Sequence, residues 1–198
     1  MTPPWPEAVV LVGEHASLVP LTPEHAEDLR QASVDGELWK LWYTRVPSPE
    51  GMDAEIDRRL GERARGAMLP FAVLDPQHRA VGMTTYMNID PLTPRLEIGS
   101  TWYRASVQRT AINTECKRML LAHAFDALGC TAVEFRTHWL NHQSRRAIER
   151  LGAKLDGVLR AHQRMADGSL RDTCVYSITA SEWPAVRSHL DFRLGRSA

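Results

Sequence analysis

The spacing of apolar residues changes from helical to extended at about residue 70, and this change constrains the fold most. Residues 22–36 and 48–66 have helical patterns, and the first opens with a Thr-Pro-Glu sequence that suits the start of a helix. Apolar residues then alternate along 81–89 and 96–102, after a short apolar run at 71–74, as is typical of strands. A doubly wound parallel sheet would alternate strands and helices from the start, so this order argues against one.

The second half of the chain predicts two more helices, each set between strands. Residues 112–128 and 141–151 have helical spacing and each pattern ends at a glycine, while residues 133–137 alternate between them. An Asp-Gly pair at 167–168 separates two further strands and predicts a hairpin, and a last helix begins near residue 181. We therefore predict an α+β (mixed α/β) fold in which one mixed sheet carries helices on both faces.

Composition and charge exclude several classes of protein. The 198 residues fit one domain, and Lys plus Arg equals Asp plus Glu at 24 each, which argues against a nucleic-acid-binding protein with a basic surface. Cys116, Cys130 and Cys174 match no metal-ligand pattern, so we expect free thiols in a reducing compartment and no structural metal. The chain has neither a secretory signal pattern nor a long apolar run, so we expect a cytoplasmic protein with no membrane partner.

Residues 97–114 predict a strand, a loop and the start of a helix, and this is where chemistry is most expected. The first turn of a helix leaves N–H groups without partners and carries positive potential, so it can bind phosphate oxygens. Arg104 and Arg109 would add direct charge. The alternative is that Asn113 or Thr114 is an ordinary N-cap, and the local pattern alone leaves both interpretations open.

Three motifs that occur in order resemble those of one family. Residues 108–113 read Gln-Arg-Thr-Ala-Ile-Asn and resemble the acetyl-CoA loop of the GNAT acetyltransferases, Gln/Arg-x-x-Gly-x-Gly/Ala. The Leu-Glu-Ile-Gly at 96–99 and the Asn-x-x-Ser-x-x-Ala-Ile-x-x-Leu-Gly-Ala at 141–153 also match. The chain is similar to the branch that includes the ribosomal-protein N-terminal acetyltransferases (RimJ/RimL-like), and the resemblance covers residues 22–190.

This resemblance implies the GNAT acyl-CoA N-acyltransferase fold, a mostly antiparallel central sheet with helices on both faces. We expect residues 1–198 to form a single GNAT domain, with flexible ends at about 1–8 and 191–198. Homodimers are common in the family, so a homodimer is a further expectation.

The resemblance also implies acetyl-CoA as the co-substrate, with no metal. Ala111 stands where the family loop usually has glycine, and Asn113 stands where it has glycine or alanine. Ala111 fits only if its backbone φ is negative, whereas Asn113 tolerates a positive φ and can keep an unusual turn. The residues expected to hold the cofactor are Trp102, Tyr103, Gln108, Arg109, Thr110, Ala111, Ile112, Asn113, Thr114, Asn141 and Ser144.

Acyl transfer to an amine requires a base for the amine and stabilisation of the leaving thiolate. Family members often place a carboxylate on the strand before the loop, which implies Glu97 as the base; a surface charge or salt bridge is the alternative. The position of the usual family acid, a tyrosine, holds Ile148, which cannot donate a proton. Ser144 and Tyr176 are the remaining candidates, against the alternatives of a serine bonded to its own helix and a core tyrosine.

Aromatic residues between the first two helices are candidates for the acceptor pocket. Trp39, Trp42 and Tyr43 lie in the region that lines the acceptor side in related enzymes, with core packing as the alternative for the two tryptophans. His138 and His142 lack a third ligand at a recognisable spacing, so surface or supporting roles are preferred to a metal site.

We therefore expect an enzyme, an acetyl-CoA-dependent N-acetyltransferase of the acyltransferase class, that works by direct attack in a ternary complex. The acceptor is a primary amine on a protein N-terminus, a peptide or a small molecule, and the sequence leaves these three open. Ile148 and Ala111 motivate the alternative of a catalytically weak acyl-CoA-binding regulatory module. A structural domain with an empty loop ranks third.

Overall fold

The first third of the chain forms a small hairpin and the two helices that the sequence predicts. In the computed structural model, which describes residues 5–196, β1 (Leu11–Val12) pairs with β2 (Ser17–Pro20). The next turn begins where predicted, because the Thr22 N–H donates to the His25 ring at 3.1 Å and Pro23 starts the turn. This turn leads into α1 (Ala26–Val34), and α2 follows after a loop (Met52–Ala64).

The remaining elements follow the predicted order of three strands and then alternating strands and helices. They are β3 (Met68–Leu74), β4 (Ala80–Asp90), β5 (Arg95–Tyr103), α3 (Ala111–Ala122), β6 (Ala132–His138), α4 (His142–Glu149), β7 (Lys154–Arg164), β8 (Leu170–Thr179) and α5 (Trp183–Arg193). None of the described helices is long and apolar enough to cross a membrane.

All eight strands belong to one sheet in the order β1-β2-β3-β4-β5-β6-β8-β7. Every neighbouring pair is antiparallel except β5 and β6, which are parallel. The predicted mixed, mostly antiparallel sheet is therefore confirmed. The β5–β6 crossover contains α3, which a parallel pair requires.

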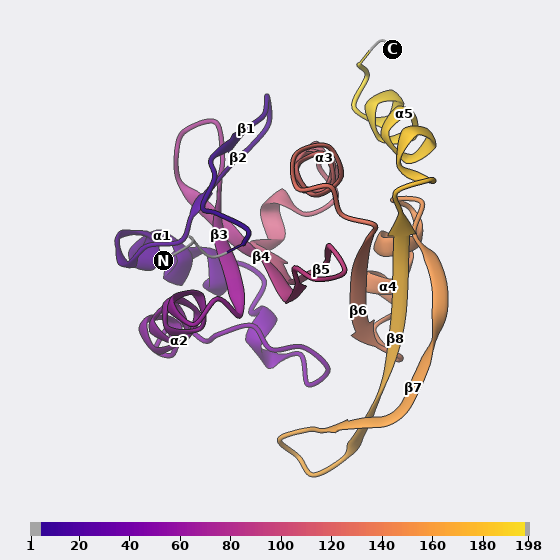
Figure 1. The fold of residues 1–198 in the computed structure, drawn as a ribbon. Helices are drawn as coiled ribbons and strands as arrows, with labels where there is room; N and C mark the ends of the chain where they lie inside the picture. Colours follow the sequence, from indigo (N-terminus) through magenta and orange to yellow (C-terminus); the bar gives the residue numbers. More distant parts are fainter. Residues whose placement is uncertain (1–4, 197–198) are drawn as a thin grey trace.

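Helices cover both faces of the sheet and divide the core in two (Figure 1). One cluster joins α1 and α2 to sheet residues such as Met83 and Trp102. The other joins α3 and α5 to residues on the opposite face, among them Phe71, Tyr86 and Ile98. Alternation along the strands assigns each side chain to one of these two layers.

The far edge of the sheet carries a long arm. Figure 1 shows the β7–β8 hairpin extending well beyond the end of β6, with the predicted Asp-Gly turn at its tip. At the chain ends, residues 191–193, which were expected to be flexible, form the last turn of α5, and Asp191 pairs there with Arg118 at 2.9 Å. The other expected loose ends include residues 1–4 and 197–198, which lie outside the described residues.

A buried carboxylate on α3 holds the turn between β1 and β2. The Glu115 side chain is fully buried and accepts hydrogen bonds from the N–H groups of residues 14, 15 and 16 at 2.9, 2.6 and 2.9 Å. Arg196 pairs with the same carboxylate. Gly13 is required here, because a Cβ at that position would lie 2.4 Å from Glu115 Cδ.

We expect Glu115→Gln to lower the free energy of unfolding by about 3 kcal/mol, because an amide NH2 would face N–H donors that now bond a carboxylate. Urea denaturation measures this change. Glu62→Gln is the matched control, since Glu62 makes only a surface ion pair with Arg65, and it should change stability by less than about 0.5 kcal/mol. Equal effects of the two substitutions would contradict this role of Glu115.

Candidate active site

The site begins where β5 and β6 stop pairing. The parallel ladder consists of Arg95↔Ala132, Leu96↔Val133 and Glu97↔Glu134. Beyond these pairs the two strands continue to Tyr103 and His138 without pairing with each other. Peptide groups on the facing edges therefore lack strand partners, and a ligand with amide groups can pair with them.

Trp102 and Tyr103, two of the residues expected beside the cofactor, lie at this end of β5. Both side chains are buried, with Trp102 in the α1–α2 layer and Tyr103 in the α3 layer. The indole Nε1 of Trp102 and the hydroxyl of Tyr103 have no hydrogen-bond partner among residues 5–196. Burial raises the pKa of Tyr103 well above its usual range, so this hydroxyl stays protonated.

A bulge in β5 lies next to the opening. Ser100 has a φ of 47°, in the left-handed region, where the pairing with β4 shifts register. Arg59 of α2 reaches this bulge from one face: it donates to Thr85 Oγ1 at 2.6 Å and to the Ser100 carbonyl at 3.4 Å. Glu55 neutralises the buried guanidinium through a 2.7 Å ion pair.

Lys117 of α3 reaches the same bulge from the other face. Its ammonium donates to Thr101 Oγ1 at 2.7 Å and to Thr84 Oγ1 at 3.2 Å, and the two hydroxyls are 2.8 Å apart. Lys117 is 5% exposed and makes no ion pair with the described residues. Burial therefore lowers its pKa to about 7.

The loop before α3 ends in a helix start of the predicted kind, but one turn earlier than Asn113 or Thr114 would place it. Thr110 is the N-cap, and its hydroxyl accepts from the Ile112 N–H at 3.4 Å. Ala111 and Asn113 both lie inside α3, and the residue with positive φ is Arg109, at 63°. The expectation that Asn113 keeps an unusual turn was therefore wrong, because the left-handed step falls before the cap.

Two further residues fix this loop. Arg104, expected to add charge at the phosphate site, instead pairs with Asp35 at 2.8 Å. Gln108 turns back and donates to the Tyr103 carbonyl at 3.0 Å, while Gln143 of α4 donates to Gln108 Oε1 at 3.4 Å. Of the two loop arginines, Arg109 is therefore the one whose charge is exposed next to the first turn of α3.

Glu97 lies at the last rung of the β5–β6 ladder, where the opening starts. Its side chain is 5% exposed; it accepts from Asn88 Nδ2 at 2.6 Å and lies 3.6 Å from Arg136 Nε. Burial raises the pKa of Glu97, and the charge of Arg136 opposes that rise. A buried carboxylate with a raised pKa has the properties of a general base.

Asn141 and Ser144 form the start of α4. Asn141 is the N-cap, and its Oδ1 accepts from the Ser144 N–H at 3.0 Å. Ile148 is buried one turn further along and packs in the core. The helix start follows the parallel strand β6, so it lies at the same end of the sheet as the loop before α3.

Tyr176, the other candidate acid, is buried, and its hydroxyl bonds to two residues of α4. It lies on β8, one strand beyond β6, and is opposite Phe135 in the core layer. Its hydroxyl donates to Glu149 at 2.8 Å and accepts from Arg145 at 3.1 Å. The alternative of a buried core tyrosine agrees with this environment.

The aromatic residues between α1 and α2 are not part of the core. Trp39 is half-buried, and Trp42 is 55% exposed. The Trp42 ring contacts Tyr43 edge-on at 5.6 Å and His138 of β6 at 5.2 Å. This contact places the α1–α2 loop against the end of β6. His138 is buried, and no metal-binding group of three His, Cys, Asp or Glu side chains occurs within residues 5–196.

Several residues of this site were missed by sequence reasoning. A signal existed for one pair, because Glu134 and Arg136 alternate with Val133 and Phe135 and so share one face of β6. No local pattern marks Arg59 or Lys117 as site residues, since their partners on the sheet are 26 and 41 residues away for Arg59 and 33 and 16 for Lys117.

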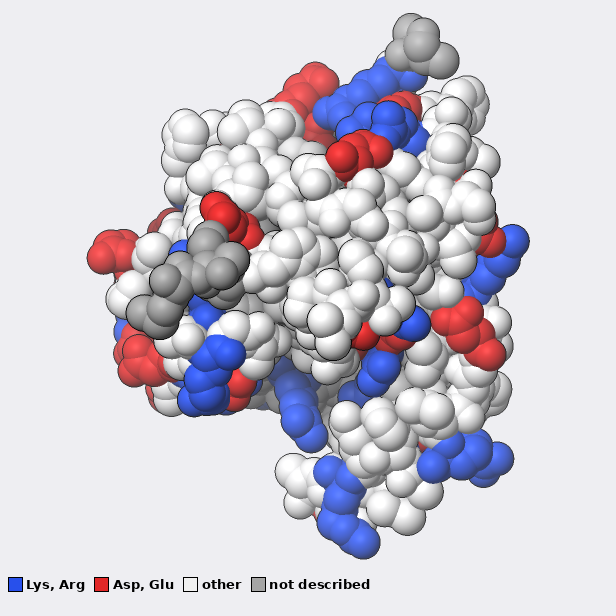
Figure 2. All heavy atoms as spheres, viewed as in Figure 1, with Lys and Arg blue, Asp and Glu red and all other residues white. Residues whose placement is uncertain are grey.

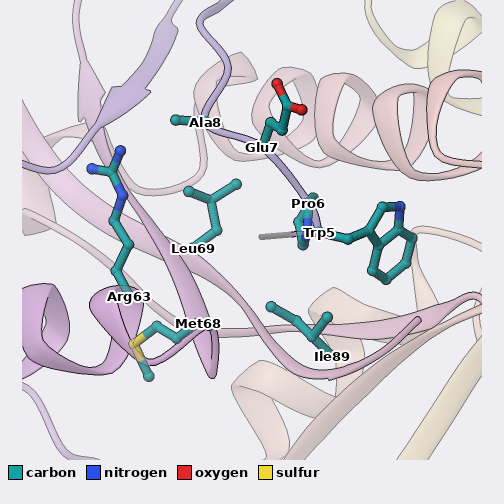
Figure 3. A pocket seen from close by; sticks show the side chains of 9 residues that line it. Trp5, Pro6, Glu7, Ala8, Arg63, Met68, Leu69 and Ile89 are labelled. Atoms are coloured by element: carbon teal, nitrogen blue, oxygen red, sulfur yellow. The ribbon is translucent and has the colours of Figure 1, made fainter. Parts of the chain in front are cut away.

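A separate pocket lies under the N-terminal segment. Figure 3 shows Trp5 and Pro6 above Ile89, with Leu69 and Arg63 to their left and Glu7 at the top. None of the candidate site residues lines this pocket. We assign no function to it.

Lys117 makes stability depend on pH in a predictable direction. Its pKa is about 7 in the folded chain and about 10.4 in an unfolded one, so between these values the unfolded chain binds one more proton and the free energy of unfolding rises with pH. The free energy of unfolding of the wild type, measured relative to that of Lys117→Met, should therefore increase from about pH 7 to about pH 10. Urea denaturation across this range tests it, with Lys40→Met as the exposed control; parallel curves for wild type and Lys117→Met would contradict the assignment.

Comparison with known proteins identifies the family. The sequence matches the model of the acetyltransferase (GNAT) domain over residues 16–154. A crystal structure named as an acetyltransferase shares 33% identity with a TM-score of 0.86, over 96% of each chain. A GCN5-related N-acetyltransferase from Brucella melitensis shares 30% identity with a TM-score of 0.83, over 97% of this chain and 88% of that chain.

The support for the RimJ/RimL branch is looser than that for the family. RimJ from Mycobacterium smegmatis, in complex with CoA-disulfide, shares 23% identity with a TM-score of 0.78, over 99% of this chain and 98% of that chain. At this identity the likeness shows the fold alone. A search of curated proteins found no match. On the domain match and the two more similar structures, the chain belongs to the GNAT family of acetyltransferases.

Proposed function

We propose that this acetyltransferase moves the acetyl group of acetyl-CoA to a primary amine by direct attack in a ternary complex. The observation that carries the proposal is the position of Glu97: a buried carboxylate at the point where β5 and β6 separate. The amine would lie on a protein N-terminus, a peptide or a small molecule. The three free, buried cysteines suit the reducing cytoplasm as the compartment.

The residues present fit acetyl-CoA at the loop and the opening. The first turn of α3 has N–H groups available for phosphate oxygens, with Arg109 beside them. Ala111 is compatible with this role because it is helical and needs no left-handed backbone. Acetyl-CoA supplies the activated thioester, and its amide-containing arm matches the unpaired edge of β5 at Trp102 and Tyr103.

Glu97 is the proposed base. It would accept a proton from the acceptor ammonium, directly or through a water, so that the neutral amine can attack. Asn88 holds the carboxylate in place through its 2.6 Å hydrogen bond. The raised pKa of Glu97 increases its basicity relative to an exposed glutamate.

Ser144 is the proposed donor to the leaving thiolate, in place of the tyrosine that Ile148 replaces. It lies in the first turn of α4, where the helix dipole also favours a negative charge. Asn141, the cap of the same turn, would lie beside the pantetheine. Gln108 connects this turn to the loop before α3 through Gln143.

We expect Glu97→Gln to reduce kcat/KM by about 10²- to 10⁴-fold with the best amine, because the amide cannot accept a proton. The acid limb of the wild-type pH profile should lie above the ordinary glutamate pKa, since burial raises the pKa of Glu97, and it should disappear in the variant. Thiol release measures both effects. Glu62→Gln serves as the control, and an unchanged rate in Glu97→Gln would overturn the assignment of the base.

We expect Arg109→Ala to weaken acetyl-CoA binding about tenfold, the loss expected for one charge-assisted phosphate contact. Calorimetry measures it, with the ion-paired surface residue Arg65→Ala as control. A chain that binds acetyl-CoA but releases no thiol with any amine of a broad panel would support the regulatory module instead. A chain that does not bind acetyl-CoA would contradict the whole proposal.

A further inference from the structure

We propose that the acceptor amine carries a carboxylate on the same molecule, and that Arg171 and Arg45 bind this carboxylate beside Glu97. This inference rests on the proposed function and specifies its substrate class. It concerns a group of charged residues on one face of β6 and β8, which the reaction described above does not use.

The strand register places these residues on one surface. Glu97 is opposite Glu134 in the parallel ladder, and Arg136 lies 2.8 Å from Glu134 and 3.6 Å from Glu97. Along the β6–β8 pair, His138 is opposite Thr173. Arg171 lies two residues before Thr173, on the same face, and its Nε donates to Thr173 Oγ1 at 3.0 Å.

The α1–α2 loop lies against this surface. Trp42 contacts the His138 ring at 5.2 Å, and Arg45 follows it three residues later. Arg45 lies close enough to Arg171 for its charge, after burial, to lower the pKa of Arg171. Figure 2 shows Lys and Arg side chains around the hollow between the body of the molecule and the β7–β8 arm.

Positive charge on this surface exceeds the available negative charge. Glu134 is already shared by Arg95 and Arg136, and Glu97 receives Asn88 and Arg136. Asp172, which follows Arg171 in the chain, binds Arg160, and Glu55, which lines the same pocket as Arg45, binds Arg58 and Arg59. Neither Arg171 nor Arg45 forms an ion pair with any of the described residues.

This imbalance points to an anionic ligand. Arg171 is half-buried, and the carboxylate whose charge acts on it, Glu97, already lies 3.6 Å from Arg136. A guanidinium that loses water without a carboxylate in direct contact is costly unless a ligand provides one. A carboxylate fits a guanidinium through two parallel hydrogen bonds. The phosphates of acetyl-CoA are assigned to the first turn of α3, so the anion at Arg171 belongs to the acceptor.

The carboxylate can belong to an amino acid or to an acidic side chain of a peptide, and two sets of substrates distinguish these two sources. The first set is the ω-amino acids from glycine to 6-aminohexanoate, each compared with its carboxamide. The second set is C-terminally amidated peptides with a free amino terminus and Asp at the second or third position, each compared with Asn at that position. In at least one set, the carboxylate member should have a kcat/KM at least about tenfold higher than its neutral partner.

Arg171→Gln should then raise KM about tenfold or more for the preferred carboxylate substrate and leave its carboxamide or Asn partner unchanged. Arg45→Gln, a change on an exposed loop, should act in the same direction and by less. Arg164→Gln is the matched control, because Arg164 lies on the arm and donates to the Gly168 carbonyl there. The affinity of each variant for acetyl-CoA should match that of the wild type.

The inference fails if carboxylate and neutral acceptors react equally in both sets, while the proposed amine acetylation stands. It also fails if Arg171→Gln impairs both members of a pair equally, or if it weakens acetyl-CoA binding, since the arginine would then serve the cofactor. Absence of thiol release with every amine would instead overturn the proposed function itself.

Discussion

The separation of β5 and β6 after three paired residues is the constraint on which the rest of the site depends. Strands that continue side by side without pairing leave peptide groups that need other partners. The chain keeps β5 in shape by pairing it with β4 on its other edge, where the bulge at Ser100 shifts the register. The loop before α3 and the start of α4 then meet at the open end, tied together by Gln108 and Gln143.

Two buried basic side chains form hydrogen bonds at the β5 bulge from opposite faces of the sheet. Arg59 comes from α2 with Glu55 as its counter-charge, while Lys117 comes from α3 and has only two threonine hydroxyls. A buried cation without a carboxylate costs stability, and an apolar residue of similar length would avoid that cost. The hydrogen bonds that Lys117 donates offset part of this cost, because they fix the Thr84 and Thr101 hydroxyls on neighbouring strands.

Much of the fold could be predicted from local patterns. The change of period, the Thr22 start of the first helical turn and the Asp-Gly hairpin all describe interactions between residues a few positions apart. Glu97 came from resemblance, whereas the helix start before α3 was expected to bind phosphate on physical grounds, and the resemblance then implied acetyl-CoA as the ligand. What could not be predicted depends on register and packing. The cap lies at Thr110, Tyr176 lies in the core layer, and the α1–α2 loop contacts His138 of β6 through Trp42.

The hydrogen-bond partners of the Glu115 carboxylate become available at different times during synthesis of the chain. It binds the β1–β2 turn near the beginning of the sequence and Arg196 near its end. During synthesis the turn and α3 are available long before residue 196 leaves the ribosome. Until then the carboxylate lacks its cation, so α3, whose first turn is proposed to hold the nucleotide phosphates, gains this support only after residue 196 has been synthesised.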